Sequence, residues 1–220
     1  MYGFAQQADN TGSAEQLPES RNGVVPNSVT PDGTYIAVRE SISNSGGTDV
    51  MLVRLGAGVA ATEPLLQSRF AEGNAEISPD GHWIAYQSND SGRNEIYVRP
   101  FPNVNGGQWQ ISNAGGTRPT WARSGHELFF VAANSTALMA VAVQLAPQFS
   151  YGNPIALFDT SKYFLSGAVS NGRTYDVSGD GRRFLLVTNP DAGNSTTPTS
   201  ATMTVVLNWF DELRSKVPVH

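Results

Sequence analysis

Short apolar runs recur along the chain, and each follows a tight polar turn that contains glycine. The turns cover residues 30–33, 78–81, 123–125 and 178–181, and the apolar runs cover residues 35–38, 83–86, 128–131 and 184–187. Apolar runs bounded by Asp-Gly or similar dipeptides are typical of antiparallel hairpins. The turn glycines lie 48, 44 and 56 residues apart, near the roughly 40 to 50 residues of a four-stranded propeller blade. The pattern predicts an all-β repeat protein.

The second repeat is the clearest, because turn residues and alternation mark all four of its strands. They are expected at residues 74–78, 83–87, 95–99 and 108–111. The same template applied to the rest of the chain predicts a single β-propeller over residues 1–220. Its expected blades are 25–67, 72–112 and 117–158, with partial blades at 1–20 and 174–213, the last including a strand at 203–207.

About four to five blades are fewer than the six to eight of many propellers. Open blade faces are apolar and strand edges carry unpaired backbone groups, so an incomplete ring needs a cover. We therefore expect a partial propeller, a fragment of a larger parent, that is completed by exchange of its terminal strands or by oligomerisation. Self-association into a homo-oligomer is the first partner prediction.

Composition limits the other partners. Hydrophobic residues make up 40% of the chain and charged residues 15%, which is typical of a folded core. The net charge of −5 gives a phosphate backbone little attraction, so no nucleic acid is expected. No apolar stretch approaches the roughly 18 residues that cross a bilayer, and residues 1–7 do not resemble a secretory signal. We expect no membrane partner, and the absence of cysteine fits any redox compartment.

The first strand of each blade is the innermost, and its polar positions are the candidate site. Counted back from the turn glycine, the fifth position holds Ser28, Glu76, Thr120 and Asp176, and the seventh holds Pro26, Asn74, Arg118 and Thr174. Because strand side chains alternate with period two, these residues are expected to face one channel. The candidate ligand-binding residues are Asn74, Arg118, Thr120 and Thr174.

Two residues at these inner-strand positions carry carboxylates, which can act in catalysis or bind a cation. Glu76 and Asp176 are candidate catalytic residues and candidate ligands of a divalent cation, with Ca²⁺ or Zn²⁺ as the possible cofactor. The alternative is an ordinary charge network between blades, in which Arg118 neutralises one acid.

The histidines offer a second possible metal site. His82 and His126 both follow the turn glycine of their blade, which places them on one rim, where two neutral imidazoles suit a metal such as zinc. The alternative is that each is a solvated turn residue. No Gly-x-Ser-x-Gly motif occurs, so a serine nucleophile on such an elbow is not expected.

The repeats resemble a known family. Residues 78–86, 91–102 and 109–112 are similar to the TolB-type, WD-like propeller repeat, in which Ser-Pro-Asp-Gly opens the second strand, and the closing segment 205–213 is also similar. The chain thus resembles the C-terminal propeller of bacterial serine/threonine kinase-linked proteins. The resemblance implies a recognition module and a periplasmic or extracytoplasmic location. The turn at Arg123-Ser124-Gly125 lacks the Pro and Asp, which argues against a ligand role for the turn aspartates.

Two function classes follow. The first is a binding or sensor module that recognises a protein or a small-molecule ligand. The second is a metal-dependent hydrolase of an ester, lactone or phosphotriester that uses a cation in the channel.

Overall fold

The computed structural model describes residues 4–5, 13–16, 22–42, 47–55, 62–161 and 172–186. All of them belong to one compact unit, Met1–Thr188. The strand predicted at 203–207 and the segment after it lie outside the described residues. Within the described residues the regular elements are strands, apart from one short 3₁₀ turn, η1 (Val104–Gly106). The all-β class predicted from the sequence is confirmed.

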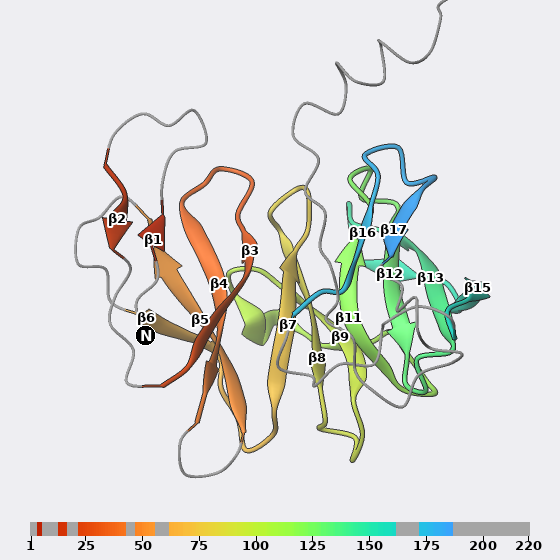
Figure 1. Ribbon diagram of the computed structural model, residues 1–220, viewed down its shortest axis with the longest axis horizontal. Helices are drawn as coiled ribbons and strands as arrows, with labels where there is room; N and C mark the ends of the chain where they lie inside the picture. The colour runs from red at the N-terminus through yellow and green to blue at the C-terminus, as the bar shows by residue number, and fades with distance from the viewer. Residues whose placement is uncertain are drawn as a thin grey trace, which may run out of the picture. The chain divides into compact units, whose positions relative to one another are not determined.

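Antiparallel sheets follow one another along the chain, from orange through green to blue in Figure 1. Blade 1 consists of β3 (Val24–Val29), β4 (Tyr35–Ser41), β5 (Thr48–Arg54) and β6 (Thr62–Leu66). Blade 2 consists of β7 (Glu72–Ile77), β8 (Trp83–Ser88), β9 (Glu95–Pro100) and β10 (Trp109–Gln110).

Blade 3 consists of β11 (Gly116–Trp121), β12 (Glu127–Ala132), β13 (Ala137–Gln144) and β15 (Ile155–Asp159), with β14 (Ser150–Tyr151) pairing at the end of β13. Blade 4 is described only through β16 (Tyr175–Val177) and β17 (Phe184–Leu186). A separate pair joins β1 (Phe4–Ala5) to β2 (Glu15–Gln16). The result is a partial β-propeller with two complete four-stranded blades, a third that carries one extra strand, and parts of others.

The repeated turn explains why each blade begins with the same hairpin. In blade 2 the hydroxyl of Ser78 donates to the Asp80 carboxylate, and the main-chain N–H of His82 donates to the same carboxylate oxygen at 3.1 Å. Gly81 has φ of +73°, a conformation that side chains disfavour. Asp80 is thus used by its own turn, and Asp32 and Asp180 make the equivalent bonds in theirs.

Apolar clusters lie between successive blades. Along β12, Leu128 and Phe130 belong to the cluster shared with blade 2, whereas Phe129 and Val131 belong to the cluster shared with blade 4. Both faces of this strand are therefore buried, and alternate side chains serve different interfaces. Blades 1 and 2 share a third cluster that includes Val50, Ile84 and Tyr86. Face-to-face packing of this kind is the arrangement of propeller blades.

The innermost strands are not regular. In β3, β7 and β11 the register shifts by one residue, between Pro26 and Ser28, between Gly73 and Glu76, and between Thr117 and Thr120. Such a β-bulge interrupts the period-two alternation of side chains. The strict alternation predicted along these strands therefore does not hold between the seventh and fifth positions before the turn glycine.

No helix among the described residues is long and apolar enough to cross a membrane.

Candidate functional site

The inner strands bring polar side chains of different blades together. A small pocket of about 50 Å³ is lined by Asn74 and Glu76 of β7, Arg118 of β11, and Arg173, which precedes β16. We call Asn74, Glu76, Arg118, Thr120, Arg173 and Asp176 the inner-strand cluster. Five of these six residues were candidates from the sequence, and Arg173 was not.

Arg173 lies between the two candidate carboxylates. Its Nη1 is 3.0 Å from Glu76 Oε1 and its Nη2 is 3.5 Å from Asp176 Oδ1. The Glu76 side chain is 21% exposed and that of Asp176 is 61% exposed. Burial raises the pKa of Glu76 to about 7, although Arg173 opposes the shift. An arginine of blade 4 therefore forms an ion pair with Glu76. From the sequence, Arg118 had been considered as the residue that neutralises one of the acids.

Arg118 makes hydrogen bonds to blade 4. It is buried, and its φ of +56° lies in the left-handed region, as does that of Asn74 at +48°. Arg118 Nε donates to the Gly172 carbonyl at 3.2 Å, and the hydroxyl of Tyr175 donates to the Arg118 carbonyl at 2.8 Å. A left-handed arginine stores about 1 to 2 kcal/mol of strain, and these contacts to blade 4 hold it in place.

Gln87 joins the two left-handed residues. Its Oε1 accepts from Asn74 Nδ2 at 2.8 Å and from the Arg118 main-chain N–H at 3.2 Å. One side chain of β8 therefore connects the bulges of β7 and β11. Amide oxygens have two lone pairs, and both are used here.

The remaining candidates lie apart from this network or at its margin. Thr120 Oγ1 is 3.5 Å from Arg173 Nη1. The hydroxyl of Thr174 is buried and has no hydrogen-bond partner among the described residues. His82 and His126 are both exposed on their turns, and His82 Nδ1 lies 2.6 Å from the Asp80 carbonyl oxygen of its own turn. No group of three or more His, Asp or Glu side chains placed to hold a metal ion occurs in the part of the chain that the structure describes.

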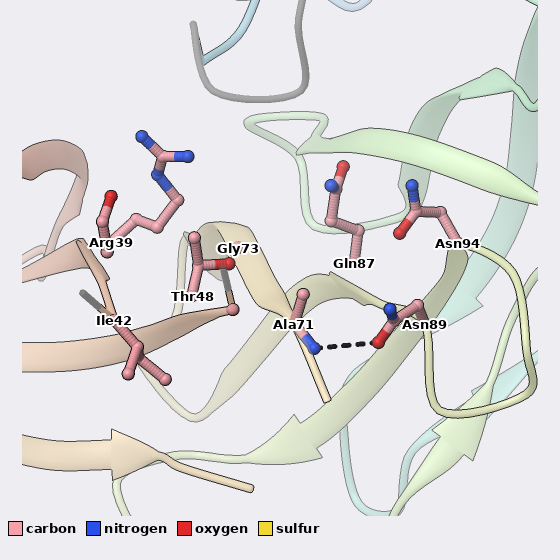
Figure 2. A pocket seen from close by; sticks show the side chains of 10 residues that line it. Arg39, Ile42, Thr48, Ala71, Gly73, Gln87, Asn89 and Asn94 are labelled. Carbon is pink, nitrogen blue, oxygen red and sulfur yellow. Dashed lines mark hydrogen bonds between the residues drawn. The ribbon is translucent and has the colours of Figure 1, made fainter. Parts of the chain in front are cut away.

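A larger pocket lies where blade 1 meets blade 2. Its volume is about 570 Å³, and its polar lining consists of Arg39, Ser41, Thr48, Gln87, Asn89 and Asn94. Figure 2 shows Arg39 on one side of this pocket, with Gln87 and Asn94 on the other. We call it the blade 1–2 pocket.

Two of its side chains are fixed by bonds to the main chain of blade 2. Asn89 Oδ1 accepts from the Ala71 N–H at 2.8 Å, the dashed line in Figure 2. Thr48 Oγ1 donates to the Glu72 carbonyl at 2.6 Å. These contacts bridge β5, the start of β7 and the end of β8, so the pocket has a preformed wall.

Sequence reasoning missed the main residues of this pocket. Arg39 and Gln87 occupy interior positions of second strands, where no motif distinguishes them from other strand residues. Glu95 was missed as well. Its side chain is fully buried, and it accepts from Arg93 Nε at 2.7 Å, from the Ser112 hydroxyl and from the Gly115 N–H at 2.9 Å. In the sequence, Glu95 is a charged residue at the start of an apolar strand. Such a pattern is common and does not indicate a buried carboxylate.

No protein-family profile matches the sequence. A search of curated proteins also gave no match. Solved structures do match. TolB from Acinetobacter baumannii superposes with a TM-score of 0.54 at 18% identity, covering 85% of this chain and 43% of that one. A TolB-type protein from Agrobacterium tumefaciens superposes with a TM-score of 0.51 at 19% identity. The match covers 64% of this chain and 51% of that one. Hydrazine synthase from Kuenenia stuttgartiensis superposes with a TM-score of 0.51 at 10% identity. The match covers 80% of this chain and 61% of that one.

The fold is that of a TolB-like propeller. Identities below 20% establish the fold and nothing finer, since propellers carry many unrelated activities. The chain spans about half the length of the TolB structures that it matches.

Proposed function

We propose that this propeller is a binding module, and that its ligand occupies the blade 1–2 pocket. The observation that carries the proposal is the pocket itself, about 570 Å³ in volume with polar side chains from both blades. Ligand sites commonly have volumes of roughly 300 to 1,000 Å³ with a few fixed polar groups. Asn89 and Thr48 are such groups, because their bonds to the main chain hold them in place.

The ligand is a small polar molecule or a short segment of another protein. A ligand that binds only the folded state raises the free energy of unfolding by about 2.7 kcal/mol when its concentration is 100 times Kd. We therefore expect members of a library of saccharides, organic acids and short peptides to raise Tm without being consumed. The proposal would be contradicted if no compound of the library raised the Tm of the wild-type protein.

The competing hypothesis is a metal-dependent hydrolase. Its support is the approach of Glu76 and Asp176 to one group, but that group is the guanidinium of Arg173. The hydrolase remains a prediction, and it requires that a chelator abolish ester, lactone or phosphotriester hydrolysis. Glu76→Gln and Asp176→Asn are then expected to reduce turnover by orders of magnitude.

Self-association and an extracytoplasmic location are further proposals. They rest on the partial ring and on the resemblance of the repeats. Light scattering of the purified chain tests the first, and a monomer at all concentrations would contradict it. Fractionation of cells that express this protein tests the second, and recovery from the cytoplasmic fraction alone would contradict it.

A further inference from the structure

The blade 1–2 pocket contains two carboxamide groups whose orientation is fixed. The Gln87 amide oxygen accepts from Asn74 Nδ2 and from the Arg118 main-chain N–H. The Asn89 amide oxygen accepts from the Ala71 N–H. Because the protein uses both oxygens, the group that each amide offers to a ligand is its NH₂.

Gln87 shows most clearly that the pocket is built for a ligand. The residue is only 4% exposed, yet its NH₂ group donates no hydrogen bond to any residue that the structure describes. Buried polar groups are normally paired, because an unpaired one loses its hydration without compensation. A ligand with a hydrogen-bond acceptor in the pocket would satisfy this group.

Thr48 offers the opposite kind of group. Its hydroxyl donates its hydrogen to the Glu72 carbonyl, with 2.6 Å between the two oxygens. A threonine hydroxyl has one donor hydrogen and two acceptor lone pairs, so the group that remains for a ligand is an acceptor. Figure 2 shows Thr48, Gln87 and Asn89 around the same pocket. The pocket therefore presents fixed donors from blade 2 and a fixed acceptor from blade 1.

The lining does not call for a charged ligand. Among the described residues that line the pocket none is acidic, and the basic one, Arg39, already has an interaction partner in the protein. Asp49 and Glu72 are sequence neighbours of lining residues but do not line the pocket themselves. In either protonation state these two acids offer an anion no attraction. The groups that remain for a ligand are uncharged.

We propose that the blade 1–2 pocket binds the hydroxyl groups of a neutral saccharide, an inference that rests on the proposed binding function. A sugar hydroxyl both accepts and donates, so it matches the NH₂ groups of Gln87 and Asn89 and the oxygen of Thr48 together. A carboxylate cannot donate to Thr48, and an ammonium group cannot accept from the amides.

A short peptide is the competing ligand, because its main chain also both donates and accepts. Peptides, however, gain much of their affinity by burying apolar or aromatic side chains in a pocket. Among the described lining residues, the apolar side chains are those of Ile42 and Ala71, and none is aromatic. The mainly polar lining therefore favours the saccharide, with hydrogen bonds rather than ring stacking as the source of affinity.

The test compares ligands that share a sugar ring and differ in charge. Wild-type protein is titrated at pH 6 with glucose, glucuronate and glucosamine, and then with the neutral sugars galactose, mannose, maltose and lactose. A dipeptide with an acetylated N-terminus and an amidated C-terminus represents the peptide class. Side-chain NH₂ signals in ¹H–¹⁵N spectra report the site. We expect the signals of Gln87 and Asn89 to move with at least one neutral sugar.

Thr48→Val is the diagnostic variant, because it keeps the shape of the side chain and removes the acceptor. We expect it to weaken binding of the neutral sugar about fivefold, the effect of one lost hydrogen bond. A ligand that only accepts hydrogen bonds would bind this variant as tightly as wild type. Thr48→Ser keeps the hydroxyl and should restore binding. Thr62→Val makes the same change on β6, outside the pocket, and is the matched control. Wild-type-like ¹H–¹⁵N spectra of the variants exclude loss of folding as the cause.

The outcomes separate the two proposals. Binding of a neutral sugar, no tighter binding of its charged analogues and a loss in Thr48→Val that Thr48→Ser restores support the saccharide site. If a charged analogue or the dipeptide binds more tightly than every neutral sugar, or if Thr48→Val binds the sugar as wild type does, the saccharide site is wrong while the binding module stands. If Thr48→Val does not fold, the comparison of charged and neutral ligands decides alone. If no compound of any class binds to wild type, both proposals fail.

Discussion

Glu76 should make this protein less stable as the pH rises through neutrality. The carboxyl has a pKa of 4.5 when unperturbed and of about 7 in the folded chain, chiefly because of burial. Below pH 4.5 both states hold the proton, so stability is unaffected. Between pH 4.5 and 7 the unfolded chain releases the proton and the folded chain keeps it, so stability falls. Above pH 7 the full penalty remains.

The magnitude follows from the two pKa values. At about 1.4 kcal/mol for each pKa unit, the difference between about 7 and 4.5 gives a penalty of about 3 kcal/mol at pH 8. Glu76→Gln removes the charge and keeps the shape. We expect the variant to match wild type at pH 4.5 and to exceed it by at most about 3 kcal/mol at pH 8.

Urea unfolding, followed by tryptophan fluorescence from pH 4.5 to pH 8, measures this difference. Asp49 and Glu72 also have raised pKa values, but they are present in both proteins and cancel. Glu63→Gln, at an exposed position of β6, is the matched control and should follow wild type. If Glu76→Gln is less stable than wild type at pH 8, the ion pair with Arg173 outweighs burial and the reasoning is wrong.

Three further changes test the packing and the charges. Phe130→Ala should lower the free energy of unfolding by about 3 to 5 kcal/mol, because this side chain fills the cluster between blades 2 and 3. Leu185→Ala, at a 73% exposed position, is the control in the same urea assay and should unfold like wild type. Glu95→Ala should lower the free energy of unfolding by about 3 kcal/mol, since Arg93, Ser112 and Gly115 lose their hydrogen-bond acceptor. A variant as stable as wild type would contradict this. Calcium, zinc or a chelator should leave Tm unchanged, because Arg173 already compensates Glu76; a metal-dependent rise would refute this.

The blades were predictable because their turns are encoded locally. The Ser78 hydroxyl donates a hydrogen bond to the Asp80 carboxylate two positions later. Gly81 takes a backbone conformation that other residues avoid. Alternation between such turns then assigns each strand. In blade 2 the strands expected at 83–87 and 95–99 correspond to Trp83–Ser88 and Glu95–Pro100.

The inner-strand cluster was predictable only in part. Counting back from the turn glycine identified Glu76, which lies after the bulge of β7, and Asp176. The count did not indicate the left-handed backbone of Asn74 and Arg118, because neither residue is a glycine that would signal it. Arg173 lies just before an inner strand, and its contact with Glu76 spans 97 positions. No local pattern reports such a contact.

Gln87 connects the two polar regions of the molecule. Its side chain lines the blade 1–2 pocket, and its oxygen binds the left-handed residues of two inner strands. Arg118 in turn is bonded to Tyr175 and Gly172 of the following repeat. A ligand that holds the Gln87 amide therefore also restrains the bulges of β7 and β11. Because Gln87 binds blade 3 and lines a pocket shared with blade 1, a bound ligand should stabilise the packing of blade 2 on blade 3 as well as that of blade 1 on blade 2. Hydrogen exchange of the β11 amides with and without the ligand measures this coupling, and protection confined to blades 1 and 2 would contradict it.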